Sequence, residues 1–442
     1  MGDRGRDRVP RLRPLRLHQR RHRHRRRRPF RGGRLSRPVD HGNEGGKSRR
    51  RRQNYGGDRQ RSVRLVRYTK GAVGRMSITE QALAISVAAG VPVLLWGSPG
   101  TGKTSVVRAL GESLGWPVEV VVGSIREPTD FSGLPVVQDG GVWLAPPAWA
   151  RRLADAEHGV LFLDELTTAP PAVQAAMLRI VLERVVGDLA LPSGVRVVAA
   201  ANPPEQAADG WELSPPLANR MVHLDWSVDA ATIAEGLAVG FPPPSVSDRH
   251  TSPDPTRLAT ARATVAAFLK VRPTLVLQVP TTSMLAGRGW PSPRSWEMVA
   301  MLLGMCDTAG ADEDVRAALV TGAVGEGPGI EFLSWRLNAD LPDPEAVLAD
   351  PDSFELPERS DRAFAVLTAV ASVAIAHGDA ESWSAAWRVL AKATSAAPDV
   401  ATLVAQTLAS ARPAGAVLPA EVLELTPVLR AAGLLPDQGS GR

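Results

Sequence analysis

Five short runs made almost entirely of apolar residues lie in the first half of the chain, near residues 93–96, 118–122, 160–164, 195–201 and 221–224. Strands that face solvent alternate apolar and polar residues, whereas uninterrupted apolar runs are typical of strands buried on both faces. Parallel strands joined by right-handed helical crossovers bury both faces of a sheet. The pattern therefore predicts an α/β core, with a parallel sheet and helices on both of its faces.

Helical patterns dominate the chain after residue 226. "RLATARATVAAFLKVRP" predicts a helix that Pro273 ends, and "WPSPRSWEMVAMLLGMC" predicts a helix that begins after a proline-rich turn, with Ser292 or Ser295 as its cap. Between the core and these helices, a second proline-rich stretch predicts a surface loop over 240–255. Past residue 310 the chain stays rich in Ala and Leu. The expected division is an α/β core at 76–226, a helical domain at 227–310 and a helical extension at 311–442.

Residues 1–75 differ from the rest of the chain in charge. They carry 27 Lys and Arg against 5 Asp and Glu, whereas the other 367 residues carry 25 against 41. The segment has almost no apolar periodicity, so it cannot bury a core and we expect it to be disordered. One interpretation is an arm that binds nucleic acid by neutralising phosphates. The other is an over-extended translation start, because Arg, Gly and Pro dominate and the ordered pattern begins abruptly at Met76.

The remaining composition narrows the class of protein. A chain of 442 residues with 44% hydrophobic and 22% charged residues is typical of a globular protein of two or three domains. No run approaches the roughly 20 apolar residues that cross a membrane, and the start lacks the pattern of a secretory signal. The single cysteine, Cys306, excludes an intrachain disulfide framework and a cysteine-rich metal site. We therefore expect a cytoplasmic protein without a membrane partner.

A glycine-rich turn, "GSPGTGKT", follows the first apolar run. It satisfies the pattern G-x-x-x-x-G-K-[ST] between a buried-strand run and a helical segment. Glycines let backbone N–H groups approach an anion, and the helix N-terminus adds the positive end of its dipole. In this pattern the lysine reaches the β- and γ-phosphates, and the last hydroxyl binds Mg²⁺. The predicted nucleotide-binding residues are Gly97, Ser98, Pro99, Gly100, Thr101, Gly102, Lys103, Thr104 and Ser105.

Polar residues also end the third and fourth runs. Asp164 and Glu165 follow "VLFL", and Asn202 follows "VRVVAAA". In a parallel α/β sheet, ligands bind at the carboxyl ends of the strands. We expect Asp164 to hold Mg²⁺ through water and Glu165 to polarise the attacking water. Taken alone, the acidic pair could be simply solvated and the Asn a turn residue before two prolines; beside the phosphate loop, Asn202 is predicted to sense the γ-phosphate.

Together these motifs resemble those of AAA+ ATPases. "GSPGTGKT", "LFLDE", "AAANPPE" and "LSPPLANRM" occur in the family's order, and the chain is similar to its MoxR-like branch over about residues 77–310. The first two are Walker A and Walker B motifs. The resemblance implies a P-loop NTPase core followed by a helical lid, here 227–310, with ATP and Mg²⁺ as cofactors.

The segment "LPVVQDGGVWLAP" has the pattern of a β-hairpin with a turn at Asp139, Gly140 and Gly141. It lies between the second and third predicted strands, where MoxR-like and related AAA+ proteins carry an insert. The resemblance implies that the hairpin projects toward a ring pore or a client. An ordinary surface hairpin is the alternative.

The resemblance also implies roles for two arginines. Arg220, in "LSPPLANRM", corresponds to the arginine finger, which acts on the nucleotide of a neighbouring subunit and contributes about 10³–10⁵-fold in rate. The alternative is a surface ion pair. Arg294 is similar to the sensor-2 arginine, which reaches the nucleotide from the lid. A finger that acts between subunits requires an oligomer.

The leading interpretation is a MoxR-like AAA+ ATPase that hydrolyses ATP in a homo-oligomeric ring, by resemblance a hexamer, and remodels or matures a protein client. The resemblance implies a client with a von Willebrand factor A-type domain. One alternative is a nucleic-acid motor, against which the acidic balance outside 1–75 argues, since tracking phosphates needs a basic surface. The other is a nucleotide-gated scaffold with little hydrolysis, against which the intact Asp164, Glu165 and Asn202 argue.

Overall fold

The protein was analysed as a computed structural model, which describes residues 76–138, 140–203, 206, 210–241, 244, 252–394 and 396–426. The Arg-rich segment 1–75 and the turn residue Asp139 lie outside the described residues. So do most residues of the predicted loop 240–255 and the end of the helical extension, 427–442.

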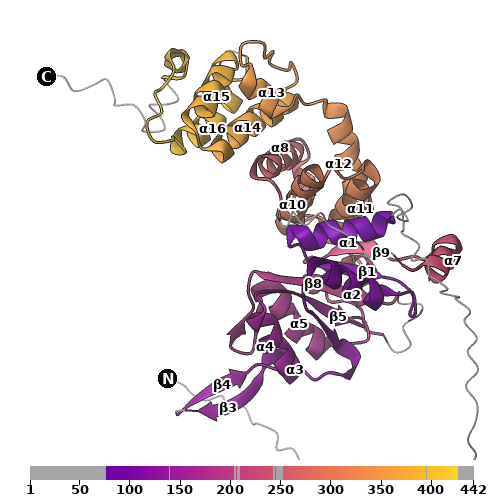
Figure 1. The fold of residues 1–442 in the computed structure, drawn as a ribbon. Coiled ribbons are helices and arrows are strands. Elements are labelled where there is room, and N and C mark those ends of the chain that lie inside the picture. Colours follow the sequence, from indigo (N-terminus) through magenta and orange to yellow (C-terminus); the bar gives the residue numbers. More distant parts are fainter. Residues whose placement is uncertain are drawn as a thin grey trace, which may run out of the picture. The chain divides into compact units, whose positions relative to one another are not determined.

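A five-stranded parallel sheet forms the centre of the α/β core (Figure 1). From one edge to the other its strands are β2 (Val118–Val122), β5 (His158–Asp164), β8 (Gly194–Ala201), β1 (Val93–Trp96) and β9 (Val222–Asp225). These strands coincide with the five predicted apolar runs to within two residues. The predicted fold class, a parallel sheet with helices on both faces, is confirmed.

Side chains from both faces of the sheet are buried. In β1, Val93 and Leu95 belong to one hydrophobic cluster, whereas Leu94 and Trp96 belong to another. Successive side chains of a strand point to opposite faces, so a strand covered on both faces must be apolar throughout. The first cluster includes α1 (Ile78–Ala89), α2 (Lys103–Leu114), α8 (Pro255–Val271), α10 (Pro293–Ala309) and α11 (Glu313–Val324). The second cluster includes α4 (Ala148–Asp155), α5 (Pro171–Glu183) and α6 (Pro215–Ala218).

The predicted hairpin is present between β2 and β5. Strands β3 (Leu134–Gln138) and β4 (Gly141–Ala145) pair in antiparallel register and extend away from the sheet (Figure 1). Its apolar side chains are largely open to solvent, with Val137 80% and Val142 69% exposed. The remaining short elements of the core are η1 (Gly123–Ile125), α3 (Thr129–Ser132), β6 (Val185–Val186) and β7 (Leu189–Ala190).

Helices make up the described chain after β9. Between the core and residue 310, α7 (Ala230–Val239), η3 (Pro273–Leu275) and α9 (Ser283–Ala286) accompany α8 and α10. Two predicted helix ends agree with the structure, because α8 stops two residues before Pro273 and Ser292 caps α10. The further helices are α12 (Glu326–Ala339), α13 (Pro344–Ala349), α14 (Ser360–His377), α15 (Ala380–Lys392), α16 (Pro398–Ser410) and η4 (Ala420–Leu425).

The hydrophobic packing does not break at residue 310. Leu319 and Val320 of α11 share a cluster with α1 and β9, so α11 packs against the core itself. Helices α13 to α16 form a cluster of their own, to which α8 contributes Ala267. None of the described helices combines the length and apolar character needed to cross a bilayer.

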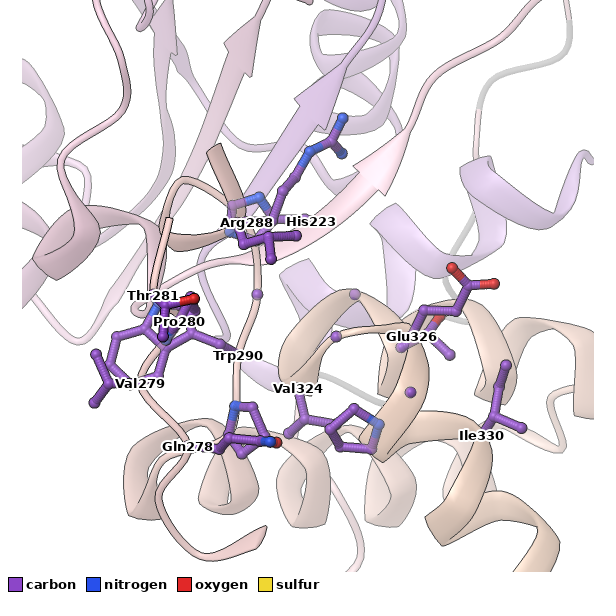
Figure 2. Close-up of a pocket in the computed structure, with 18 of the residues that line it drawn as sticks. His223, Gln278, Val279, Pro280, Thr281, Arg288, Trp290, Val324, Glu326 and Ile330 are labelled. Atoms are coloured by element: carbon purple, nitrogen blue, oxygen red, sulfur yellow. The ribbon is translucent and has the colours of Figure 1, made fainter. Parts of the chain in front are cut away.

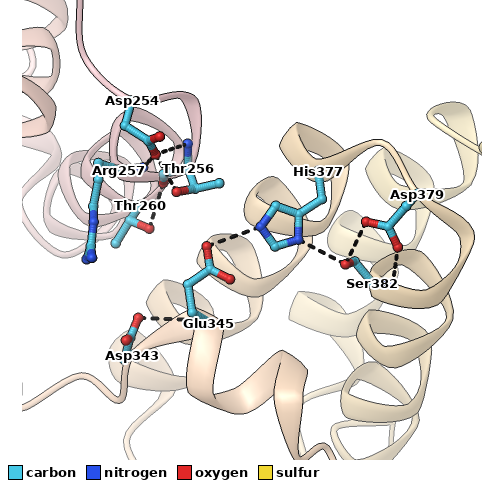
Figure 3. A network of polar contacts seen from close by, with 9 residues as sticks. All are labelled: Asp254, Thr256, Arg257, Thr260, Asp343, Glu345, His377, Asp379 and Ser382. Atoms are coloured by element: carbon cyan, nitrogen blue, oxygen red, sulfur yellow. Dashed lines mark hydrogen bonds and ion pairs between the residues drawn. The ribbon is translucent and has the colours of Figure 1, made fainter. Parts of the chain in front are cut away.

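Polar contacts join the helix ends of this last cluster (Figure 3). His377, in the last turn of α14, contacts Glu345 of α13 through Nε2 and the Ser382 hydroxyl of α15 through Nδ1, at 3.2 and 2.9 Å. Asp379 caps α15 by accepting from the Ser382 N–H, and Asp343 caps α13. Caps of this kind satisfy backbone donors that a helix start leaves open.

A buried histidine on β9 should make the fold sensitive to acid. His223 Nδ1 accepts from the Trp96 indole at 2.8 Å and Nε2 lies 3.0 Å from the Ala218 carbonyl, while burial lowers the histidine pKa to about 4. In the unfolded chain this histidine binds a proton near pH 6.5, but in the folded chain it does so only near pH 4. The stability that comes from keeping His223 neutral is therefore present above pH 6.5 and is lost as the pH falls toward 4. We expect it to reach about 3 kcal/mol of unfolding free energy.

Urea unfolding at pH 7 and pH 4.5 measures this effect. His223→Gln should reduce the difference between the two pH values by about 2–3 kcal/mol, and His158→Gln, at an exposed histidine, should leave it unchanged. An equal difference in all three proteins would contradict the assignment.

Candidate functional site

The glycine-rich turn after β1 has the backbone conformation that its sequence requires. Gly100 and Gly102 adopt φ of +78° and +87°, a region that side chains with a Cβ rarely enter. Gly102 is also the N-cap of α2, and Lys103 is the first residue of that helix. The turn therefore presents backbone N–H groups at a helix N-terminus, which is an arrangement suited to anions.

Lys103 reaches back across the turn. Its Nζ donates to the Gly97 carbonyl at 2.6 Å and to the Ser98 carbonyl at 2.9 Å, and it lies 3.4 Å from Asn202 Oδ1. Burial lowers the pKa of the ammonium, and the nearby Asp164 carboxylate partly offsets this. The lysine thus joins the end of β8 to the turn after β1.

Two oxygen atoms that could coordinate a divalent cation lie together. The Thr104 hydroxyl donates to Asp164 Oδ2 at 3.0 Å, and Asp164 Oδ1 accepts from the Glu165 N–H at 2.9 Å. Hydroxyl and carboxylate oxygens are ligands that Mg²⁺ prefers in nucleotide sites. The residues predicted to hold Mg²⁺ therefore fit such an ion in type and in place.

The Glu165 side chain is oriented by an unusual backbone conformation and by a serine. It adopts φ of +57°, which is uncommon outside glycine. Its side chain accepts a hydrogen bond from the Ser124 hydroxyl, in η1 at the end of β2. Such strain persists where the surrounding structure fixes it, and it is frequent at functional sites.

These residues line one cavity of about 320 Å³, at the carboxyl edge of the sheet. Its lining comprises Pro99, Gly100, Thr101, Gly102, Lys103, Thr104, Ser105, Asp164, Glu165 and Asn202. The carbonyls of Gly97 and Ser98 contact Lys103 directly. The structure thus brings the predicted turn, the acidic pair and Asn202 together.

A larger cavity of about 870 Å³ lies between β9, the segment 278–291 and the start of α12 (Figure 2). In its lining, Arg288 pairs with Asp225 at 2.9 Å, and both ring nitrogens of His223 have partners. Among the described residues no lysine lines this cavity, and the glycine-rich turn at the start of α2 is not part of its lining. The smaller cavity is therefore the candidate site, in spite of its size.

Arg220 and Arg294 do not line the candidate site. Arg220 precedes β9, whose first residue, Val222, pairs with Val93 at the start of β1. The phosphate loop instead follows the end of β1, at Trp96. At about 3.3 Å per residue, β1 places about 13 Å of strand between the two edges. Arg220 therefore lies at the amino edge of the sheet, opposite the cavity of its own chain.

Arg294 lies beside Arg220 rather than beside the phosphate loop. Burial lowers the pKa of the Arg220 guanidinium, and the like charge of Arg294 lowers it further. A buried asparagine explains why the two arginines lie near each other. Asn219 Nδ2 donates to the Trp290 carbonyl at 2.8 Å, and Asn219 Oδ1 accepts from Ser292 at 2.7 Å. This contact joins the residue before Arg220 to the start of α10, which carries Arg294.

Two residues of the site region were not singled out in the sequence. Ser124 follows β2 and contacts Glu165, and Trp226 follows β9 and donates its indole N–H to the Thr101 carbonyl at 3.0 Å. Both follow a strand at the carboxyl edge, as Asp164 and Asn202 do. The position after a strand, which identified Asp164 and Asn202, also applies to Ser124 and Trp226. A serine or a tryptophan at such a position, however, belongs to no sequence motif that would mark it as functional.

Comparison with known proteins places this geometry in a family. The family described as AAA domain (dynein-related subfamily) matches residues 92–221, from the start of β1 to the residue before β9. Residues 92–221 of the chain thus form an AAA domain. The AAA+ match contains the phosphate loop, the acidic pair and Asn202.

Individual relatives match the same AAA+ segment. MoxR of Paracoccus denitrificans is 34% identical over 116 residues, 26% of this chain and 34% of its own. MoxR of Methylorubrum extorquens is 34% identical over 128 residues, 28% of this chain and 37% of its own. WtsA of Pantoea stewartii subsp. stewartii, named as a regulatory protein of a pathogenicity locus, is 31% identical over 121 residues, 26% and 38% of the two chains.

These matches are partial. The AAA+ segment of this chain spans little more than a third of the length of each of the three relatives. A crystal structure from Cytophaga hutchinsonii, provisionally described as an ATPase, has 17% identity and a TM-score of 0.38, over 58% of this chain and 87% of that one. A similarity this low is no evidence for the fold, which the topology of the sheet already establishes.

Proposed function

We propose that this protein is a MoxR-like AAA+ ATPase that hydrolyses ATP with Mg²⁺ and uses the energy to remodel a protein client. The observation that carries this proposal is the convergence of Lys103, Asp164 and Asn202 on one cavity, together with Thr104 and Glu165. These side chains come from three separate parts of the chain, at 103–104, 164–165 and 202, yet all line one cavity.

The chain's own residues perform the chemistry as follows. Lys103 exchanges the carbonyl oxygens of Gly97 and Ser98 for oxygens of the β- and γ-phosphates, which stabilises their charge. Thr104 and Asp164 hold Mg²⁺, which neutralises phosphate charge when it is bound. Asn202 contacts the γ-phosphate and reports its presence.

Glu165 polarises the attacking water. The hydroxyl of Ser124 donates to one oxygen of its carboxylate, and a carboxylate has a second oxygen that can accept from water. A general base must lie within hydrogen-bond reach of the proton that it accepts. Ser124 therefore orients the carboxylate without blocking its role as a base.

Arg220 and Arg294 complete the site of a neighbouring copy. Their place at the amino edge of the sheet supports action on another chain's nucleotide, since about 13 Å of strand separates that edge from their own phosphate loop. Arg220 is half-buried, and its Nη1 donates to the Pro216 carbonyl, which holds the guanidinium at that edge. Homo-oligomerisation follows, and a hexameric ring is the assembly that we propose.

The client is proposed to be a protein, with a von Willebrand factor A-type domain as the class to test first and the cytoplasm as the compartment. The exposed apolar side chains of the hairpin β3–β4 support contact with a protein. A regulator of transcription is the second candidate, because WtsA matches the same AAA+ segment about as well as MoxR does. That segment contains the ATPase residues, so its similarity does not distinguish remodelling of a protein client from regulation of transcription.

ATP turnover by the full chain tests the proposal. We expect Mg²⁺-dependent phosphate release, and Lys103→Ala should abolish nucleotide binding because the β- and γ-phosphates lose their cation. Lys270→Ala, on the exposed surface of α8, serves as the matched control. Turnover unchanged in Lys103→Ala would sink the proposal, and strong stimulation by DNA or RNA of a chain starting at Met76 would favour a nucleic-acid motor.

A further inference from the structure

We infer that Trp226 is a positioning residue that orients the phosphate loop through its indole N–H. The inference rests on the proposed binding of a nucleotide at this loop. Trp226 directly follows β9, and its side chain is 9% exposed within the cluster that contains Leu95 and Val106. Its Nε1 donates to the Thr101 carbonyl in the middle of the loop, at 3.0 Å.

The backbone of Trp226 also fixes the start of the loop. Its N–H donates to the Trp96 carbonyl, which extends the pairing of β1 and β9 by one residue. The loop then leaves β1 at Gly97, where a Cβ would lie 2.5 Å from the Trp226 carbonyl oxygen. Only glycine fits so close to this backbone. One residue thus holds the loop both where it begins and at its middle.

The orientation of one peptide explains why the indole matters. In a planar trans peptide, the carbonyl of Thr101 and the N–H of Gly102 point in opposite directions. Thr101 and Gly102 line the cavity, whereas Trp226 lies outside its lining. With the carbonyl directed toward Trp226, the Gly102 N–H is directed toward the cavity, where it can donate to a phosphate oxygen.

This contact stabilises one orientation of the peptide. Rotation of the peptide changes ψ of Thr101 and φ of Gly102, and glycine adopts positive and negative φ almost equally well. A reversed peptide would present a carbonyl oxygen to the phosphates, and two negatively polarised groups repel each other. The same glycines that let the loop approach an anion therefore require a partner outside the loop. Trp226 supplies that partner from the opposite side of the loop.

Two tryptophan-to-phenylalanine variants separate this role from a purely structural one. Trp226→Phe keeps an aromatic ring in place of the indole and removes the donor. Trp383→Phe removes a similar donor at a remote place, because the Trp383 indole donates to the Leu408 carbonyl at 2.8 Å in the C-terminal helices. The full chain and both variants are titrated with ADP and Mg²⁺ by calorimetry, and their melting temperatures are measured without nucleotide.

We expect Trp226→Phe to bind ADP roughly three- to tenfold more weakly, as the loss of one hydrogen bond implies. Trp383→Phe should bind ADP as the unchanged chain does, and both variants should melt at similarly lowered temperatures. Equal affinity in all three proteins, or equal weakening in both variants, would overturn the inference. If the unchanged chain binds no ADP, the proposed function itself fails, and the inference fails with it.

Discussion

Arg220→Ala is expected to lower ATP turnover by about 10³–10⁵-fold. In the proposed role, the guanidinium neutralises charge that develops on the phosphoryl group during transfer, and the variant loses this group. Nucleotide binding should persist, because Lys103 and the loop that surround the phosphates lie at the opposite sheet edge. Arg179→Ala, which removes an exposed arginine paired with Glu183 on α5, should leave turnover nearly unchanged.

Mixing variants tests whether Arg220 acts between chains. In a mixed ring, an Arg220→Ala subunit keeps its own Glu165 and can receive Arg220 from a Glu165→Gln neighbour. Equimolar mixing should therefore restore part of the turnover that neither variant shows alone. No recovery would argue against a finger supplied by a neighbour, and full activity of Arg220→Ala alone would make Arg220 a surface residue.

Glu165→Gln should retain ATP binding and lose turnover by about 10²–10⁴-fold, the contribution typical of a positioned base. The glutamine amide has almost the same shape, so the loop and Asp164 should keep their arrangement. It cannot accept a proton from the attacking water. Binding of a fluorescent ATP analogue and phosphate release from the same preparation give the two values.

Ser124→Ala is the matched control for Glu165. It removes the hydrogen bond that holds the carboxylate but keeps the base itself, so most of the turnover should remain. If Ser124→Ala and Glu165→Gln lose activity equally, the hydrogen bond rather than the carboxylate is what turnover requires. Retained turnover in Glu165→Gln would remove Glu165 from its proposed role.

The strands and the phosphate loop could be predicted because their signals are local. An uninterrupted run such as 93–96 records burial on both faces of the sheet, and α4 to α6 on one side and α1 with α2 on the other provide that burial. The loop pattern likewise combines glycines in the left-handed region with the first residues of a helix, all within eight positions of the chain. Physical constraints confined to neighbouring residues leave a pattern in the sequence.

The convergence of Asp164 and Asn202 could also be predicted, for a topological reason. Parallel strands have their carboxyl ends at one edge, so polar residues that end adjacent strands must lie near each other. The same reasoning covered Ser124 and Trp226, but it gave them no chemical role, because a serine and a tryptophan after a strand are common in many structures.

By itself, the sequence determined the sheet, the phosphate loop and the edge at which the polar residues meet. Only the tertiary structure decided where the arginines and Trp226 lie. Arg294 lies beside Arg220 because Ser292 and Asn219 bond across 73 positions, and Trp226 reaches Thr101 across 125. Contacts between such distant residues depend on how helices and strands pack, and no short pattern records them. The orientation of the loop is therefore a property of the folded chain.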